Sequence, residues 1–93
     1  TQDIAHAFAR EGKSNIVVCA DQQIAGRGRG GNIWISPTGN LYASLILKPN
    51  LSAQHVGQYS FLTAVALRRT MKKFCNAQSH FVQKWPNDVL CDG

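Results

Sequence analysis

The stretch Gln23-Ile24-Ala25-Gly26-Arg27-Gly28-Arg29-Gly30-Gly31 organises the sequence, because two arginines alternate with glycines between two apolar runs. Glycine tolerates positive φ and close backbone approach, so successive N–H groups can converge on an anion. Each guanidinium adds a planar fork of donors to the same oxygens. Such a segment buries little and loses much backbone entropy on ordering. We therefore expect a mobile loop that closes over a phosphate or carboxylate.

Other interpretations of this loop compete. Gly26, Gly28 and Gly31 satisfy the dinucleotide fingerprint G-x-G-x-x-G, but that fingerprint must open a helix, and residues 32–37 are typical of a short strand and a turn. The Arg-Gly alternation is also compatible with a non-catalytic anion- or RNA-binding module, although such segments are more typical of tails. A solvated loop without a ligand is the third alternative.

Composition and charge indicate one small globular domain with anionic ligands or partners. The 93 residues are 44% hydrophobic, and ten Lys and Arg against five Asp and Glu give a net charge of +5. Four of the basic residues, Arg68, Arg69, Lys72 and Lys73, crowd the end of one predicted helix, where they offset its dipole. The net charge alone is therefore a weak argument that the protein binds nucleic acid.

Three cysteines without C-x-x-C spacing favour neither a disulfide framework nor a zinc site, so we expect no metal and a reducing, cytoplasmic location. The apolar runs are far shorter than the ~20 residues that a membrane span needs. We therefore expect no membrane partner.

Apolar periodicity predicts a protein that mixes helices with strands. Helices are expected over residues 1–11 and 52–74, and strands over 16–20, 32–35, 41–47, 80–84 and 89–91. The 41–47 strand is apolar on nearly both faces and is therefore expected at the centre of a sheet. The 52–74 helix has an apolar stripe and is expected to be the main buried helix, the stripe comprising Phe61, Ala64, Leu67, Met71 and Phe74.

Several polar residues are expected near the loop. Thr1 can cap the first helix, either as a plain cap or as the seat of a polar ligand group. Gln23 follows a buried strand and reaches the mouth of the loop, and Lys84 ends a strand beside Trp85 and Pro86. An isolated lysine at a strand end usually faces solvent, and Trp34 after the loop is more often a core residue than a ligand contact.

The sequence ends at Asp92-Gly93, and Asp-Gly after an apolar strand is a strong hairpin signal. A strand without its partner leaves open N–H and C=O groups. We therefore expect that the chain is part of a larger domain, and that by itself it can self-associate.

Four motifs together resemble the biotin–protein ligases: Ala20 to Gly31, Trp34-Ile35-Ser36-Pro37, Gly39-Asn40-Leu41-Tyr42 and Lys84-Trp85-Pro86-Asn87-Asp88. The similarity begins at Thr1-Gln2-Asp3, which resembles the end of the family's Ser-Thr-Asn-Asp-type motif. It covers residues 1–93, but only about the first half of the family's catalytic domain. The resemblance thus implies a domain truncated at the C-terminal side and possibly also at the N-terminal side.

The resemblance implies an α+β fold with a mixed, largely antiparallel sheet backed by helices, like that of class II aminoacyl-tRNA synthetases and biotin synthetases. It implies a ligase that uses biotin and Mg-ATP to form biotinyl-adenylate, and then transfers biotin to a lysine of a biotin carboxyl carrier protein domain. A DNA partner is implied only if a DNA-binding domain precedes residue 1.

Carried over from the family pattern, Arg27, Gly28 and Arg29 would close over the phosphate and the carboxylate. Lys84 would lie beside the same carboxylate and the α-phosphate, so Arg27 and Lys84 are the expected catalytic residues. The other expected substrate-binding residues are Thr1, Gln2 and Gln23 at the biotin head group, with Trp34 in the same site.

The sequence departs from the family at Gly30, where a basic residue is usual, and the serine expected before Thr1 is absent. The next strand of the family pattern, which helps to hold ATP, would lie beyond Gly93. Catalysis by these 93 residues alone is therefore expected to be weak or absent. A lipoate–protein ligase, which shares the fold and the adenylate chemistry, is the alternative within this class.

Overall fold

The N-terminal helix and the strands that follow it form the first of two parts of the chain. The structure is a computed structural model that describes residues 1–93, and these divide into Thr1–Pro49 and Asn50–Gly93. Each part contains one two-stranded antiparallel sheet and one longer helix.

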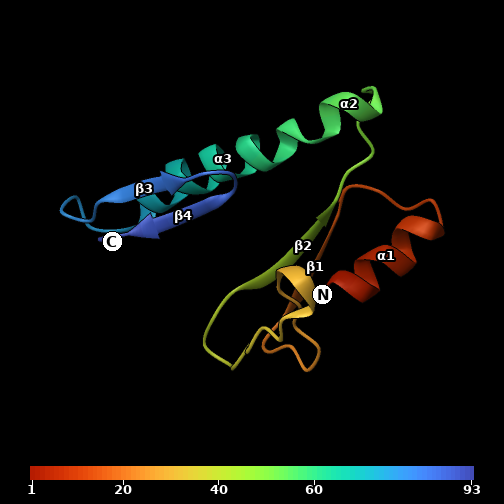
Figure 1. Cartoon of the computed structure of the whole chain (residues 1–93), viewed down its shortest axis with the longest axis horizontal. Helices are drawn as coiled ribbons and strands as arrows, with labels where there is room; N and C mark the ends of the chain where they lie inside the picture. The colour runs from red at the N-terminus through yellow and green to blue at the C-terminus, as the bar shows by residue number, and fades with distance from the viewer. The chain divides into compact units, whose positions relative to one another are not determined.

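In the first part, helix α1 (Gln2–Arg10) packs against strands β1 (Ile16–Ala20) and β2 (Tyr42–Ile46), as Figure 1 shows. The strands pair from Ile16 opposite Ile46 to Ala20 opposite Tyr42. Because side chains alternate across a strand, one face of this sheet meets α1, and Ile46 is buried there. The sequence predicted α1, β1 and β2 to within two residues at each end.

The connection from β1 to β2 carries the glycine–arginine loop, with a short 3-10 turn, η1 (Arg29–Gly31), at its tip. The strand predicted over residues 32–35 does not form. Only isolated bridges join Gln23 to Ser36 and Arg27 to Ile33. Ile33 and Ile35 are more than four-fifths exposed, so no apolar layer stabilises an extended strand at this point.

In the second part, short helix α2 (Ala53–Val56) precedes α3 (Gln58–Phe74), and strands β3 (Phe81–Lys84) and β4 (Asp88–Cys91) form a hairpin along α3 (Figure 1). Ala64 of α3 and Phe81 of β3 are buried. The Arg68 side chain donates from Nε to the carbonyl oxygen of Phe81 at 2.9 Å, which ties the helix to the hairpin.

The continuous helix predicted over residues 52–74 is interrupted at Gly57, which separates α2 from α3. The Gly57 carbonyl accepts from the Ser60 N–H, an i to i+3 bond that tightens the backbone there. A glycine inside a helix destabilises it by about 1 kcal/mol relative to alanine, so a break at this residue has a physical cause.

Two further predictions are wrong in this chain. Strand β2 is not central, because it pairs only with β1. Helix α3 is not mainly buried: Ala64 is its only buried residue, and Phe61, Leu67 and Phe74 of the predicted stripe are exposed. The β3–β4 hairpin is too narrow to cover a stripe that runs along about four turns of helix.

The observed architecture is therefore mixed α/β with small antiparallel sheets, which confirms the α+β expectation in its coarse form. All three cysteines are free thiols. None of the helices combines the length and the apolar character needed to cross a lipid bilayer.

Candidate functional site

The glycine–arginine loop folds back on itself between Gln23 and Ser36. The Trp34 N–H donates to the Gly26 carbonyl at 3.0 Å, and the Gln23 N–H donates to the Ser36 carbonyl at 3.1 Å. Closer to the tip, the Gly28 N–H donates to the Asn32 carbonyl at 2.7 Å. These bonds hold the two sides of the loop together, although the flanking residues form no regular strand.

Gly26 is required by the packing of this loop. A Cβ atom at this position would collide with the Trp34 carbonyl oxygen and would lie 2.6 Å from the Ser36 hydroxyl oxygen. The first of these neighbours is backbone and cannot move away easily. Only glycine therefore allows the two sides of the loop to approach this closely.

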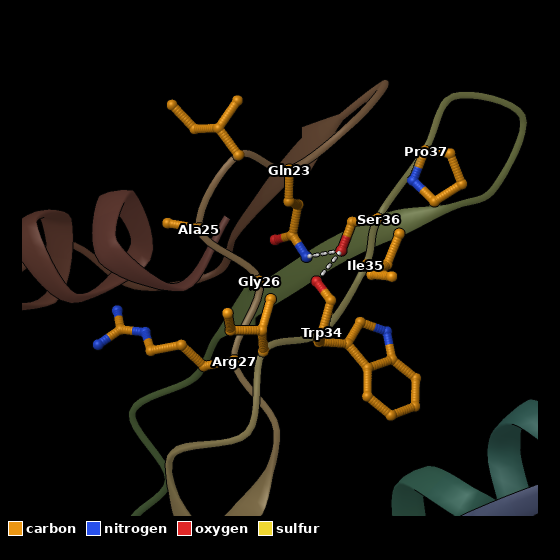
Figure 2. Close-up of a pocket in the computed structure, with 10 residues that line it drawn as sticks. Gln23, Ala25, Gly26, Arg27, Trp34, Ile35, Ser36 and Pro37 are labelled. Carbon is orange, nitrogen blue, oxygen red and sulfur yellow. Dashed lines mark hydrogen bonds between the residues drawn. The ribbon is translucent and has the colours of Figure 1, made fainter.

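A cavity of about 520 Å³ lies against the loop. Figure 2 shows the residues that line it, with the side chains of Arg27 and Trp34 pointing in opposite directions. Its wall combines apolar side chains with a few polar groups, as small-molecule sites commonly do. The lining residues are Gln23, Ile24, Ala25, Gly26, Arg27, Ile33, Trp34, Ile35, Ser36 and Pro37.

A hydrogen-bonded cluster connects this cavity to the start of α1. The backbone nitrogen and the hydroxyl of Thr1 both donate to Gln23 Oε1, at 2.9 and 3.0 Å. Ser44 of β2 donates to Thr1 Oγ1 at 2.8 Å. Gln23 Nε2 donates to Ser36 Oγ at 3.4 Å, and Ser36 donates in turn to the Trp34 carbonyl oxygen at 3.2 Å (Figure 2).

Thr1 does not use its side chain to cap α1. It occupies the N-cap position, but its hydroxyl makes no cap hydrogen bond and turns toward Gln23 instead. Both alternatives weighed for Thr1 had its side chain capping the helix, and that cap does not form; the role of Thr1 toward a ligand stays a prediction.

Arg27 is paired with Asp3, in the first turn of α1, through Nη2 and Oδ1. Both side chains are more than half exposed. An exposed pair of this kind contributes about 0–1 kcal/mol, so an anionic ligand can replace the carboxylate at little cost. Arg29 is exposed within η1 and adds a second cation to the loop.

The structure thus brings three of the predicted site residues around one cavity, namely Gln23, Arg27 and Trp34, with Thr1 bonded to the first of them. Trp34 is 63% exposed, so it is not a core residue in this chain. Gly28 is half-buried in the loop, and Gln2 is exposed at the start of α1.

Lys84 belongs to the other part of the chain. It is exposed at the end of β3, with Asp88 as its partner in the register of the hairpin. Its predicted role beside the loop stays a prediction.

Sequence reasoning missed Asp3 as the partner of Arg27, and it missed Ser36 and Ser44 as members of the hydrogen-bonded cluster. The sequence could have indicated Asp3, because it lies in the first turn of the predicted helix, where a carboxylate is favoured by the helix dipole. Ser44 carried no such signal, because it lies 43 residues from Thr1 in the chain.

At the end of the β3–β4 hairpin, partial desolvation raises the pKa of the Cys91 thiol, and the Asp92 carboxylate, which accepts from Sγ, raises it further. The thiol is exposed and lies outside the cavity described above. A raised pKa keeps it protonated, and hence weakly nucleophilic, around neutral pH.

The fold and the site define an α/β protein with an arginine-bearing loop beside a cavity whose wall is mostly apolar with a few polar groups. The whole chain, residues 1–93, matches the model of the Biotin/lipoate A/B protein ligase family. The chain belongs to this family.

Individual relatives are ligases by name, and two of the three described here are named as biotin ligases. The chain is 42% identical over 76 residues to a Biotin--[acetyl-CoA-carboxylase] ligase of Paracoccus denitrificans, covering 82% of this chain and 32% of that protein. It is 39% identical over 95 residues to the Bifunctional ligase/repressor BirA of Bacillus subtilis strain 168, covering 100% of this chain and 29% of that protein. A Biotin--protein ligase of Homo sapiens is 31% identical over 86 residues, which cover 88% of this chain and 12% of that protein. The chain therefore spans a third or less of these relatives.

Proposed function

We propose that these 93 residues form the N-terminal half of the catalytic domain of a biotin–protein ligase. The proposed fold of the complete domain is the one shared with class II aminoacyl-tRNA synthetases. The observation that carries the proposal is the contact between Thr1 and Gln23 at the base of the glycine–arginine loop. The two residues lie more than 20 positions apart in the sequence, and the family resemblance predicts that both contact the biotin head group.

In the proposed reaction, a carboxylate oxygen of biotin attacks the α-phosphorus of Mg-ATP, and the bond to the β-phosphate breaks with release of pyrophosphate. The amine of a carrier lysine then attacks the acyl carbon, and AMP leaves. Magnesium enters as part of the nucleotide substrate. Adenylation needs no general base, because the carboxylate is already the nucleophile.

The main barrier to adenylation is that two anions must meet. Cations and N–H donors aimed at the developing charge lower this barrier, and they act most strongly in a site without water. In the proposal, Arg27, Gly28 and Arg29 close over the carboxylate and the phosphate. Lys84 supplies a further positive charge beside the α-phosphate.

The hydrogen-bonded cluster around Thr1 and Gln23 would hold the biotin head group, at the end opposite the carboxylate. Thr1, Gln2 and Gln23 would bind the head group, which carries a urea with one carbonyl and two N–H groups. Trp34 would provide an apolar surface in the same cavity, of which it is a lining residue. This division places apolar and polar parts of the ligand against matching parts of the wall.

The deciding experiment is biotin-dependent exchange of labelled pyrophosphate into ATP by the full-length protein. We expect exchange with biotin and none with lipoate. Exchange with lipoate alone would make the protein a lipoate–protein ligase. Binding of an RNA oligonucleotide without any exchange would support the anion- or RNA-binding module instead.

The second step is tested with a biotin carboxyl carrier protein domain as the acceptor. We expect mass addition of one biotin at its lysine, and none when that lysine is replaced by arginine. The cytoplasmic location and any DNA partner stay predictions.

A further inference from the structure

The Arg27 guanidinium of the glycine–arginine loop already binds a carboxylate of the protein itself, because Nη2 donates to Oδ1 of Asp3 in the first turn of α1. The proposed reaction assigns Arg27 to the ligand and gives Asp3 no part. No other carboxylate forms an ion pair with the loop: Glu11 pairs with Lys13, and Arg29 forms no ion pair. The contact is therefore specific to one of the two loop arginines.

Asp3 is held near the loop by a fixed part of the structure. Two residues earlier, the Thr1 hydroxyl donates to Gln23 Oε1 at 3.0 Å and accepts from Ser44 of β2 at 2.8 Å. These partly buried bonds join the start of α1 to the base of the loop. Because they do not involve Asp3 or Arg27, they can keep the carboxylate in reach of the loop whether or not a ligand is bound.

The pairing directs Arg27 away from the other side of the cavity. Arg27 is a lining residue, but Figure 2 shows its side chain extending away from Trp34, and its guanidinium ends at Asp3 of α1. A guanidinium that uses one of its donors on Asp3 has fewer left for a phosphate or a carboxylate of a ligand. Closure of the loop over a ligand therefore requires that Arg27 exchange one anion for another.

The exposure of the pair makes this exchange possible. The Arg27 side chain is 59% exposed and the Asp3 side chain 68%, so water and a ligand anion can reach both. An exposed ion pair is only weakly stabilising, and a ligand phosphate that also meets the N–H groups of the loop can replace the carboxylate. The contact is thus sufficient to orient the arginine in the free protein without preventing its release.

We propose that Asp3 is a positioning residue that holds Arg27 in the open form of the loop and competes with the phosphate of the ligand for the guanidinium. This inference rests on the proposed function, which supplies the phosphate. Without the carboxylate, Arg27 is free before the ligand arrives, so no contact has to be broken on binding. The substitution Asp3→Asn should therefore tighten binding, whereas the loss of a contact that supports the bound state would weaken it.

The first test measures the Kd of the full-length protein for biotinol-adenylate, a phosphodiester analogue of biotinyl-adenylate that cannot transfer biotin. Asp3→Asn should lower this Kd about two- to fivefold, the range that an exposed ion pair sets. Asp3→Glu keeps a carboxylate and should stay close to the unmutated value. Glu11→Gln, which removes the same charge at the other end of α1, is the matched control and should leave the Kd unchanged. An unchanged or higher Kd for Asp3→Asn would overturn the inference.

A double-mutant cycle separates competition for Arg27 from simple repulsion between Asp3 and the phosphate. In an Arg27→Ala background, Asp3→Asn should have no further effect on the Kd, because there is no guanidinium to compete for. In an Arg29→Ala background it should keep its full effect, since Arg29 is not paired with Asp3. A gain in affinity that persists without Arg27 would identify repulsion between the two anions and count against the inference.

The third test needs no ligand. Trypsin binds the arginine after which it cleaves through a carboxylate of its own, so in the free protein it competes with Asp3 for Arg27. We expect the initial rate of cleavage after Arg27, relative to that after Arg29, to rise about two- to fivefold in Asp3→Asn. A loop that only becomes looser would be cleaved faster at both sites. An unchanged ratio would therefore refute the role of Asp3.

The proposed function and the role of Asp3 fail in different ways. An unmutated protein without biotin-dependent pyrophosphate exchange removes the proposed function, and the competition with a ligand phosphate with it. Exchange in the unmutated protein, together with an unchanged Kd and an unchanged cleavage ratio for Asp3→Asn, removes only the role of Asp3.

Discussion

The two charged residues expected to drive adenylation differ in how the structure holds them. Arg27 is anchored by an exposed carboxylate, Asp3, that an incoming anion can displace. Lys84 ends a β-strand of a hairpin that is fixed against α3, so its backbone position is set by the β3–β4 pairing. We therefore expect the arginine to move on ligand binding and the lysine to act from a fixed position.

Replacing Arg27 by alanine should leave biotin binding intact and weaken retention of biotinyl-adenylate. A charge-assisted contact in a closed site contributes roughly 2–4 kcal/mol, so release of the intermediate should be at least about tenfold faster. The measurement is the off-rate of preformed adenylate. Arg10→Ala, an exposed arginine at the end of α1, is the control. An unchanged off-rate in the Arg27 variant would contradict the assignment.

Replacing Lys84 by glutamine should slow adenylation far more than it weakens ATP binding. A cation between two anions matters most as they converge, so its effect is larger in the transition state than in the ground state. Single-turnover adenylation and the Kd for ATP separate the two effects, with Lys72→Gln at the exposed end of α3 as the control. Equal losses in rate and affinity would argue that Lys84 only binds the nucleotide.

At the scale of helices and strands, local sequence patterns predict an element correctly where residues close in the sequence determine its structure. Helix α1 and strands β1 and β2 follow from periodicity and from β-branched residues, and they form where expected. The absent strand at residues 32–35 and the exposed stripe of α3 depend on what packs against them, which periodicity cannot report. The cluster of Thr1, Gln23 and Ser44 joins segments that are distant in the sequence, so local patterns cannot predict it. The motif resemblance grouped two of its members, Thr1 and Gln23, at one ligand group.

The break at Gly57 predicts the direction in which a substitution there changes the stability of the protein. Gly57 has helical backbone angles and open space where a Cβ would lie, so Gly57→Ala should stabilise the protein by about 0.5–1 kcal/mol and join α2 to α3. Gly12→Ala is the matched control, because Gly12 also has open space but a φ of +80°, where alanine is strained. Denaturant midpoints of the full-length variants should therefore shift in opposite directions. A destabilising Gly57→Ala would show that the break is required by contacts outside these helices.

At the scale of the whole molecule, the chain buries very little of its apolar surface. It is 44% hydrophobic, yet the buried apolar side chains are only Ile46, Ala64 and Phe81. On the outer face of the first sheet, Val17 stands opposite Leu45, and both are more than half exposed. Contiguous apolar surface of this kind favours association with another surface.

We therefore expect the isolated 93-residue chain to self-associate at micromolar concentration, with little or no biotin-dependent pyrophosphate exchange. Pairing through the exposed sheet face and the open strand edges would cover apolar side chains and satisfy free N–H and C=O groups, which a monomer leaves to water. Sedimentation velocity measures the association, and Leu45→Lys should reduce it, because a charge on that face cannot be buried without a partner. A monodisperse monomer that melts cooperatively and exchanges pyrophosphate as fast as the full-length protein would contradict both expectations, since it would mean that these residues complete their own core and their own active site.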